Sequence, residues 1–255
     1  MKQYGLVSIV MPCYNGEKYI LRTIRSVQKQ TYQNWELLIV DDCSTDRSEQ
    51  VIKSVDDPRI HVLTNTENSG AAVSRNYALR MAKGKWVAFL DSDDLWEPQK
   101  LEKQLRFMIE KDYKFTFTDY RIIFPDGKNS PYIYTGPARV TKNKMWRYCY
   151  FSTITVMYDR EYVGLIQIAD VKKNNDYAMW LKIIEKTDCY RYPHCLSVYC
   201  KRDNSISSGS KWKLIKHHYI LFRKACNISP PLAVLCTLRN LIWGVHKKLF
   251  YRKKV

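Results

Sequence analysis

The sequence predicts an α/β fold: a mixed, mainly parallel sheet flanked by helices, with a helical and basic C-terminal appendage. Short apolar runs at residues 6–11, 35–40 and 86–90 are typical of strands buried on both faces of a sheet. The segments between these runs space their apolar residues as amphipathic helices do. This alternation of strand and helix predicts βαβ units with right-handed crossovers.

The first half of the chain predicts a regular series of strands and helices. In chain order these are a strand at residues 6–11, a helix at 17–30, a strand at 35–40, a helix from the cap cluster at 44–46 to residue 55, a strand at 59–63, a helix at 71–82 and a strand at 86–90. Pro12 is expected to stop the first strand, and Gly84 to end the third helix. Because parallel strands end at one edge of a sheet, the polar clusters after the first, second and fourth strands should meet there.

The second half predicts more varied elements. They are a helix from Pro98 to about residue 111, a strand at 115–124 with a hairpin partner at 132–134, a strand at 152–158, a helix at 175–186, short strands at 189–192 and 196–200, and helices at 211–226 and 232–250. No internal repeat interrupts this order.

The charge of the chain favours acidic partners such as phosphates, nucleic acid or anionic lipid. Formal net charge is +17, and thirteen of the 42 Lys and Arg residues lie from Lys201 onward, where Asp203 is the one acid. The eight cysteines form no CxxC pair, so reduced thiols are expected rather than a zinc site. The N-terminus has no long apolar run typical of a secretion signal, and no run of eighteen apolar residues predicts a spanning helix.

An acidic cluster, Asp91-Ser92-Asp93-Asp94, follows the buried run at 86–90. Three carboxylates at the end of a buried strand are costly unless positive charge lies nearby. A hard divalent cation carrying phosphates would fit there, and a solvated acidic turn before a helix is the alternative.

Three other polar groups have both a functional and a structural interpretation. Asp41 and Asp42 could accept hydrogen bonds from a base or ribose, or form a solvated turn. Arg75 could reach a diphosphate, or make a surface ion pair. Asp176 could act as a general base, or be a first-turn helix acid. Without GxGxxG after the first strand and without GxxxxGK[ST], dehydrogenase and P-loop functions are disfavoured.

Four motifs together resemble the inverting family 2 glycosyltransferases of GT-A fold. They are SIVMPCYN at 8–15, LIVDDCSTD at 38–46, NSGAAVSRN at 68–76 and FLDSDD at 89–94. They cover roughly residues 5 to 100, and a weaker match continues through Asn175-Asp176-Tyr177 to about Ser207. The resemblance implies a Rossmann-like catalytic domain at 1–208, with a nucleotide-binding half at 1–100 and an acceptor half at 101–208. Residues 209–255 form the appendage.

The resemblance also implies roles for individual residues. It places Pro12, Tyr14, Glu17 and Asp41 around the base, with Asp42 as a further member, Arg75 beside the base and phosphates, Asp91 near the ribose and metal, Asp93 on Mn²⁺ or Mg²⁺, Trp96 and Asp94 at the acceptor, and Asp176 as the catalytic base. Two positions depart from the family pattern. Asn175 stands where Glu usually precedes the base, and Arg202 stands where His is usual, so Arg202 is expected to hold the leaving diphosphate.

The implied function is transfer of a hexose from a nucleotide sugar, UDP-hexose being favoured, to a hydroxyl of a lipid-diphosphate-linked glycan. Such enzymes build O-antigen, capsule or similar surface polysaccharide, which implies a cytoplasmic enzyme peripheral on the inner face of the plasma membrane. The alternatives are a nucleic-acid-binding protein, suggested only by the charge, and an inactive nucleotide-sugar-binding homologue. The favoured function involves no nucleic acid.

The basic tail has two interpretations. Leu235, Leu238, Ile242, Val245 and Leu249 recur at spacings of three and four, and Lys and Arg crowd the chain end. The helix could pack these residues on the catalytic domain. Alternatively, it could lie on an anionic membrane surface, which the charge and the resemblance favour.

Overall fold

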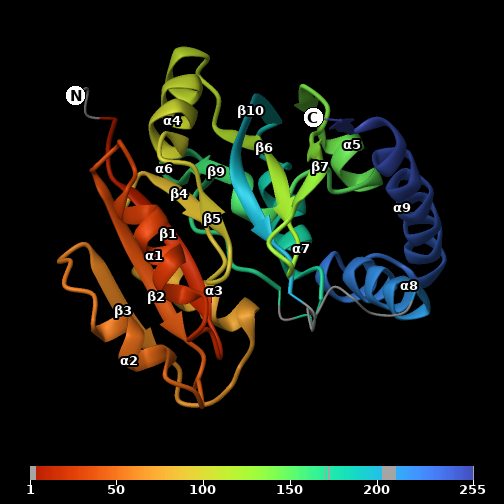
Figure 1. Cartoon of the computed structure of the whole chain (residues 1–255). Coiled ribbons are helices and arrows are strands. Elements are labelled where there is room, and N and C mark those ends of the chain that lie inside the picture. The colour runs from red at the N-terminus through yellow and green to blue at the C-terminus, as the bar shows by residue number, and fades with distance from the viewer. Residues whose placement is uncertain (1–3, 170, 172, 203–210, 255) are drawn as a thin grey trace.

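The computed structural model describes residues 4–169, 171, 173–202 and 211–254 (Figure 1). Its described strands form one mixed sheet with helices on both faces, as the sequence predicts. The last part of the motif that ends at Ser207 lies outside the described residues.

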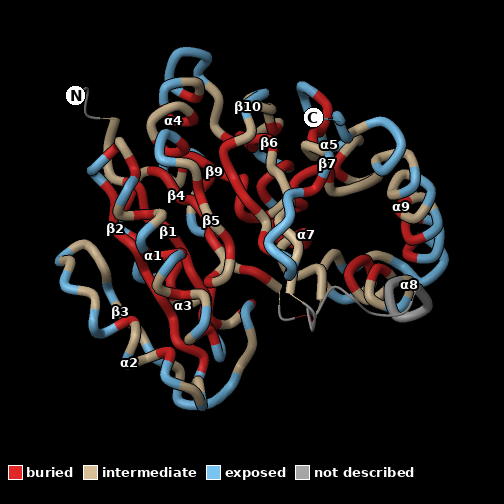
Figure 2. The backbone as a smooth tube through the Cα atoms, in the orientation of Figure 1, coloured by how far each residue is buried: buried red, intermediate tan, exposed pale blue. Residues whose placement is uncertain are grey.

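The N-terminal half is the parallel part of the sheet. Neighbouring strands run in the order β4 (Trp86–Phe89), β1 (Val7–Cys13), β2 (Trp35–Asp41) and β3 (Ile60–Thr64). Helices α1 (Ile20–Gln28), α2 (Ser48–Lys53) and α3 (Ala71–Met81) alternate with them along the chain. Strands β1, β2 and β4 are buried along their whole length, as Figure 2 shows, because helices cover both faces. Their carboxyl ends therefore meet at one edge.

The C-terminal half adds mostly antiparallel strands. Next to β4 come β9 (Val156–Asp159), β6 (Phe115–Ile123), β7 (Asn129–Tyr134) and β11 (Arg252–Lys254). The long strand β10 (Cys189–Cys200) runs parallel to β6 and pairs with β5 (Leu95–Trp96) and β8 (Arg139–Val140). The helices here are α4 (Lys100–Glu110), α5 (Lys142–Arg147), α6 (Arg160–Val163), α7 (Asn175–Ile183), α8 (Lys211–Ile220) with a following π-helical turn (Leu221–Ala225), and α9 (Pro230–Phe250).

Several sequence-based boundaries need correction. Pro12 lies inside β1, opposite Val40, instead of ending the strand. The cap cluster at 44–46 precedes a shorter helix, α2, whose first residue is Ser48. The expected strand at 152–158 begins as a 3₁₀ turn, Thr153–Thr155. The two short strands at 189–192 and 196–200 are one strand, β10, whose register against β6 shifts between them.

Two apolar clusters hold the layers together, one on each face of the sheet. Ile20, Ile24 and Val27, the face predicted for α1, are buried in the cluster that also contains α4 side chains. On the other face, Trp180 of α7 packs edge-on against Phe89 of β4, with ring centroids 5.2 Å apart. This packing fixes α7 against the strand that leads into the acidic cluster.

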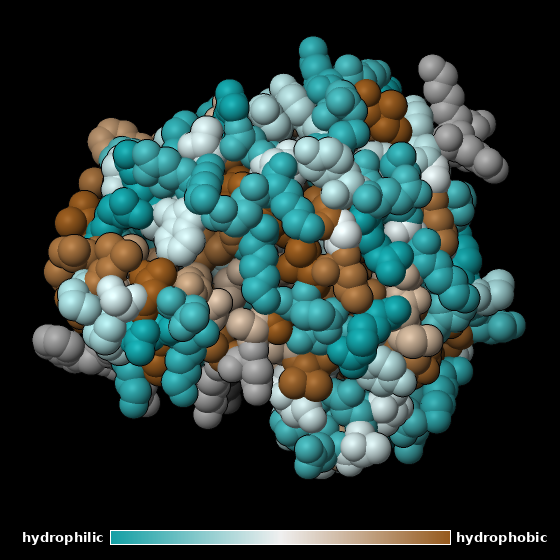
Figure 3. Space-filling model, turned by 180° about the vertical axis from the view of Figure 1, so that it is seen from behind, coloured by the Kyte–Doolittle hydropathy of each residue, from teal (hydrophilic) through white to brown (hydrophobic). Residues whose placement is uncertain are grey.

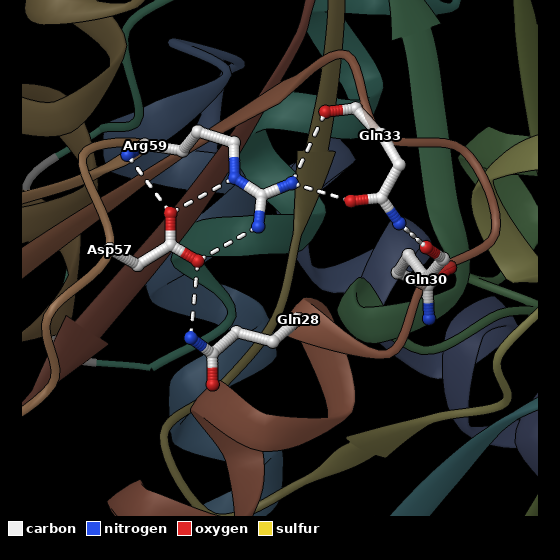
Figure 4. A network of polar contacts seen from close by, with 5 residues as sticks. All are labelled: Gln28, Gln30, Gln33, Asp57 and Arg59. Carbon is white, nitrogen blue, oxygen red and sulfur yellow. Dashed lines mark hydrogen bonds and ion pairs between the residues drawn. The ribbon is translucent and has the colours of Figure 1, made fainter.

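A polar network fixes α1 against the edge of the parallel sheet (Figure 4). Arg59 donates two hydrogen bonds to Asp57, at 2.9 and 2.8 Å, and one to the Gln33 side chain at 2.7 Å. Gln28 of α1 donates to the same Asp57 carboxylate at 3.1 Å. Hydrogen bonding to Arg59 lowers the pKa of Asp57, so the carboxylate stays charged at neutral pH.

Candidate active site

The acidic cluster occupies the short connection between β4 and β5, at the carboxyl edge of the parallel strands. Asp91 and Asp93 are half-buried, whereas Asp94 is fully buried. The alternative of a solvated acidic turn is therefore wrong for Asp94. Burial and the neighbouring Asp91 raise the pKa of Asp93, while Arg202 opposes that rise. The loop thus concentrates negative charge that needs positive partners.

Two arginines from distant parts of the chain supply that positive charge. Arg75, one turn into α3, donates a hydrogen bond to Asp91, and Arg202, just after β10, forms an ion pair with Asp93. Arg75 is buried, so the surface-ion-pair alternative is wrong. Burial works against its charge, but Asp91 and Asp176 raise the pKa of Arg75 above its ordinary value.

Asp176 lies at the first turn of α7 and faces the same group. Thr153 Oγ1 donates a hydrogen bond to Asp176 Oδ2 at 2.6 Å, and the Asp176 carboxylate contributes to the raised pKa of Arg75. Arg75 Nη1 and Asn175 Oδ1 are 3.5 Å apart. The fold therefore brings Asp176 to the acidic cluster across 85 residues of sequence from Asp91.

Polar residues also gather at the carboxyl ends of β1 and β2, beside the acidic cluster. Asp41 is buried and accepts hydrogen bonds from the amide and hydroxyl of Ser44, at 3.0 and 2.5 Å. Pro12 is buried within β1, while Tyr14 is 47% exposed. Glu17 accepts a hydrogen bond from the Arg47 amide at 3.1 Å. An exposed ring beside buried carboxylates could receive a flat, polar ligand.

Asp42 anchors the loop before α3. It is buried, and its carboxylate accepts hydrogen bonds from the Ser69 amide at 3.0 Å, the Gly70 amide at 2.7 Å and the Asn65 side chain at 2.7 Å. Gly70 has φ +86°, which favours glycine. The solvated-turn alternative is thus wrong for Asp41 and Asp42. These bonds fix the start of the helix that carries Arg75.

The two residues expected at the acceptor are both buried here. Asp94 accepts a hydrogen bond from the Cys200 amide at 2.7 Å, and Trp96 Nε1 donates to the Ile154 carbonyl at 2.8 Å. The Trp96 ring also covers Lys100 Nζ, 3.9 Å from the ring centroid. Burial raises the pKa of Asp94 and lowers that of Lys100. Both residues thus have structural partners and are almost completely buried, so an acceptor could contact very little of either side chain.

The donor set suits a hard cation that brings part of its own coordination shell. Among the described residues, no group of three or more His, Cys, Asp or Glu side chains could hold a metal alone. Asp91 and Asp93 nevertheless offer carboxylate oxygens next to arginines that could bind a diphosphate. Mg²⁺ and Mn²⁺ are often held by one or two carboxylates together with substrate phosphates and water. The residues present therefore fit such an ion.

Sequence reasoning missed three residues at this site. Thr153 holds Asp176, Arg22 donates to the Asp93 carbonyl at 3.2 Å, and the Tyr19 ring centroid lies 4.4 Å from the Arg202 guanidinium. Arg22 and Tyr19 come from α1 or its N-cap and carry no motif. Their sequence signal was only that α1 begins just after the first polar cluster.

Comparisons with known proteins bear on the family and the fold of this chain. Residues 8–164 match the family model described as Glycosyl transferase family 2. TuaG of Bacillus subtilis (strain 168), named provisionally as a teichuronic acid biosynthesis glycosyltransferase, is 40% identical over 96% of this chain and 98% of its own length. WfgD of Escherichia coli, named UDP-Glc:alpha-D-GlcNAc-diphosphoundecaprenol beta-1,3-glucosyltransferase, is 37% identical over 96% of each chain.

Solved structures show the same fold. S. aureus TarS 1–349, in complex with UDP-GlcNAc, superposes with a TM-score of 0.71 over 92% of this chain and 71% of that chain, at 21% identity. The mannosyltransferase PcManGT of Pyrobaculum calidifontis, in complex with GDP-Man and Mn²⁺, gives a TM-score of 0.66 over 95% of this chain and 75% of its own, at 19% identity. The predicted GT-A architecture is therefore confirmed.

Among the described residues, none of the helices is both long enough and apolar enough to cross a bilayer.

Proposed function

This chain belongs to glycosyl transferase family 2, and we propose that it transfers a hexose from a UDP-linked donor. The acceptor in this proposal is a hydroxyl of a lipid-diphosphate-linked glycan, and the transfer inverts the anomeric carbon. The relative WfgD is named for a UDP-Glc donor and a diphosphoundecaprenol-linked acceptor, which supports both choices of substrate. An acceptor of this kind would keep the enzyme at the inner face of a membrane.

One observation carries the proposal. Asp176, held by Thr153, lies in the same polar group as the pairs Arg75–Asp91 and Arg202–Asp93. A carboxylate base beside a diphosphate-binding group is what a single in-line displacement at a sugar carbon requires. The two arginines supply positive charge for the negative charge that grows on the leaving nucleotide.

The proposed mechanism assigns each step to residues of this chain. Tyr14, Glu17 and Asp41 hold the base of the donor, and Arg75 and Arg202 bind its diphosphate. Asp176 accepts the proton of the acceptor hydroxyl while that oxygen attacks the anomeric carbon from the face opposite the leaving group. The carbon–oxygen bond to the diphosphate breaks in the same step, so an α-linked donor yields a β-linked product.

We propose Asp93, with help from Asp91, as the residues that would hold Mn²⁺ or Mg²⁺. When bound, such an ion supplies charge neutralisation for the leaving diphosphate. Since Arg202 pairs with Asp93 here, Arg202 would have to leave this carboxylate to bind the phosphates of a donor.

Nucleotide binding and turnover test the proposal together. The full chain is incubated with UDP-, GDP- and dTDP-sugars in Mn²⁺, Mg²⁺ or EDTA, while thermal stability and released nucleoside diphosphate are followed. We expect a metal-dependent rise in Tm with UDP that Asp93→Ala abolishes. Asp176→Asn should keep this rise but lower turnover by roughly 100-fold or more, because it removes a general base.

Asp56→Asn is the matched control, since this exposed carboxylate lies in the loop before β3, away from the site. It should change neither readout. Full turnover in Asp176→Asn would exclude that residue as the base. A chain that no nucleotide stabilises in the presence of metal would contradict the donor assignment.

A further inference from the structure

Helix α9 packs against the rest of the molecule with its small and polar side. Ala233, Cys236, Thr237 and Asn240 are buried. Asn240 Nδ2 donates to the Arg147 carbonyl at 3.1 Å and to the Tyr177 hydroxyl at 3.2 Å. A side chain on Gly244 would meet the Tyr148 ring at 3.0 Å, so glycine permits this close approach. The inner face of α9 is thus in contact with the rest of the molecule.

The opposite face of α9 is apolar and exposed. Its large side chains are between 47% and 69% exposed: Leu232, Val234, Leu235, Leu238, Ile242, Val245, Leu249 and Phe250. Five of these residues, Leu235 to Leu249 at spacings of three and four, form one continuous stripe along the helix. A single exposed leucine is ordinary, but a stripe of this length marks an interaction surface.

A groove between α8 and α9 extends this surface. It has a volume of about 330 Å³ and is lined by Ile215, Lys216, Tyr219, Val234, Thr237 and Leu238. Figure 3, in which α8 and α9 lie at the left, shows hydrophobic side chains gathered there among hydrophilic ones. The apolar surface therefore runs from α9 into a groove whose volume could hold part of a hydrocarbon chain.

The positive charge around this surface indicates a negatively charged partner. Residues 211–254 contain eleven Lys and Arg and no Asp or Glu. Lys216, Lys224 and Lys248 are exposed, as are the three basic residues of β11. A second copy of this chain would bring the same positive charge to the interface and be repelled. Anionic phospholipids carry negative headgroups above an apolar interior, so a bilayer that contains them complements both features.

We propose that α9 lies in the plane of an anionic membrane, with the stripe from Leu235 to Leu249 among the acyl chains and the surrounding lysines and arginines on the headgroups. The inference deepens the proposed function and rests on it in one respect: a lipid-linked acceptor would be reached at this surface. The binding itself requires neither donor nor catalysis.

Co-sedimentation with vesicles tests the surface directly. The full chain is mixed with vesicles of neutral phosphatidylcholine, alone or together with anionic phosphatidylglycerol. We expect binding to the anionic vesicles that weakens at high salt. Ile242→Glu, which puts a charge at the centre of the stripe, should reduce the partition coefficient at least tenfold.

Ile109→Glu is the matched control, because Ile109 is also an exposed isoleucine on a helix, α4, away from the stripe. It should bind vesicles like the wild type. Equal binding by Ile242→Glu, or no binding to any vesicle, would overturn the proposal. A dimer that Ile242→Glu dissociates, without vesicle binding, would instead identify a protein interface and also overturn it.

The UDP-dependent rise in Tm separates this proposal from the proposed function. If both variants keep that rise while vesicle binding is absent, the docking surface alone is wrong. If vesicle binding follows the expectation but no nucleotide stabilises the chain, the docking surface stands and the donor assignment is wrong.

Discussion

Thr153 controls the position of the candidate base through one hydrogen bond, from its hydroxyl to Asp176 Oδ2. Thr153→Val removes the bond and keeps the shape of the side chain. Because a hydrogen bond to a charged group contributes about 1.5–3 kcal/mol, we expect kcat to fall roughly tenfold or more, while KM for the donor changes little. Steady-state kinetics with a UDP-hexose measures both constants.

Thr153→Ser separates positioning from packing. Serine keeps the hydroxyl but lacks the methyl group, which leaves a small void. We therefore expect a kcat near the wild-type value and a slightly lower Tm. Equal loss of kcat in the Val and Ser variants would show that the methyl group matters rather than the hydrogen bond, and would contradict the positioning role.

At the residue scale, the sequence could identify the groups that follow apolar runs. Asp41 ends β2, and Asp91 and Asp93 lie in the connection that follows β4. The parallel order of β4, β1 and β2 brings these groups to one edge of the sheet. Thr153 could not be found in this way, since its role exists only through a contact with Asp176. The burial of Asp94 and Trp96 was also hidden, because it depends on β10 and on the turn before β9.

At the element scale, Asp42 determines where α3 begins. Its carboxylate accepts hydrogen bonds from two backbone amides of the loop, and Asp42→Asn would place an amide NH₂ or a single oxygen against these donors. We expect a loss of about 2–3 kcal/mol in the free energy of unfolding, as a buried donor is left unsatisfied. Denaturant unfolding measures this loss. Arg75 lies one turn further on, so stabilisation by UDP should also weaken.

Asp56→Asn serves again as the comparison, with an expected change within about 0.5 kcal/mol, as for most surface substitutions. If Asp42→Asn unfolds like this control, the loop does not depend on the carboxylate. If it is destabilised but keeps full nucleotide protection, the loop and Arg75 are not coupled.

Element types were easier to predict than their directions and faces. The βαβ series follows from apolar periodicity, and the hairpin of β6 and β7 follows from the Pro125–Gly127 turn. The sequence could not show which side of α9 packs inward. Apolar periodicity normally marks the buried side, yet here the small residues pack inward and the leucines face outward. Strand β11 was missed because three basic residues lack any strand pattern.

At the scale of the whole molecule, α9 connects the proposed membrane surface to the candidate base. The Tyr177 hydroxyl accepts a hydrogen bond from Asn240 of α9 and donates one to the Met145 carbonyl. Tyr177 directly follows Asp176, so the orientation of α9 on a bilayer would also orient the base. The C-terminal helices thus contact the residue next to the candidate base, and β11 pairs with β7 and so joins the chain end to the sheet.

Acid should weaken the contact between α8 and the start of α7 through His218. The ring is buried in α8, its Nδ1 lies 3.3 Å from Asn174 Nδ2 before α7, and burial lowers its pKa to about 4. An unfolded chain binds this proton near pH 6.5, so between about pH 6.5 and 4 the unfolded state holds more protons and folding stability falls as the pH falls. The difference between the two pKa values limits the loss of unfolding free energy to roughly 3 kcal/mol.

Urea unfolding at several pH values in this interval tests the role of His218. The loss of stability should be smaller in His218→Gln, because glutamine can still accept a hydrogen bond from Asn174 but does not titrate. Identical pH profiles for the two proteins would mean that the imidazole gains its proton without loosening the contact between α8 and α7.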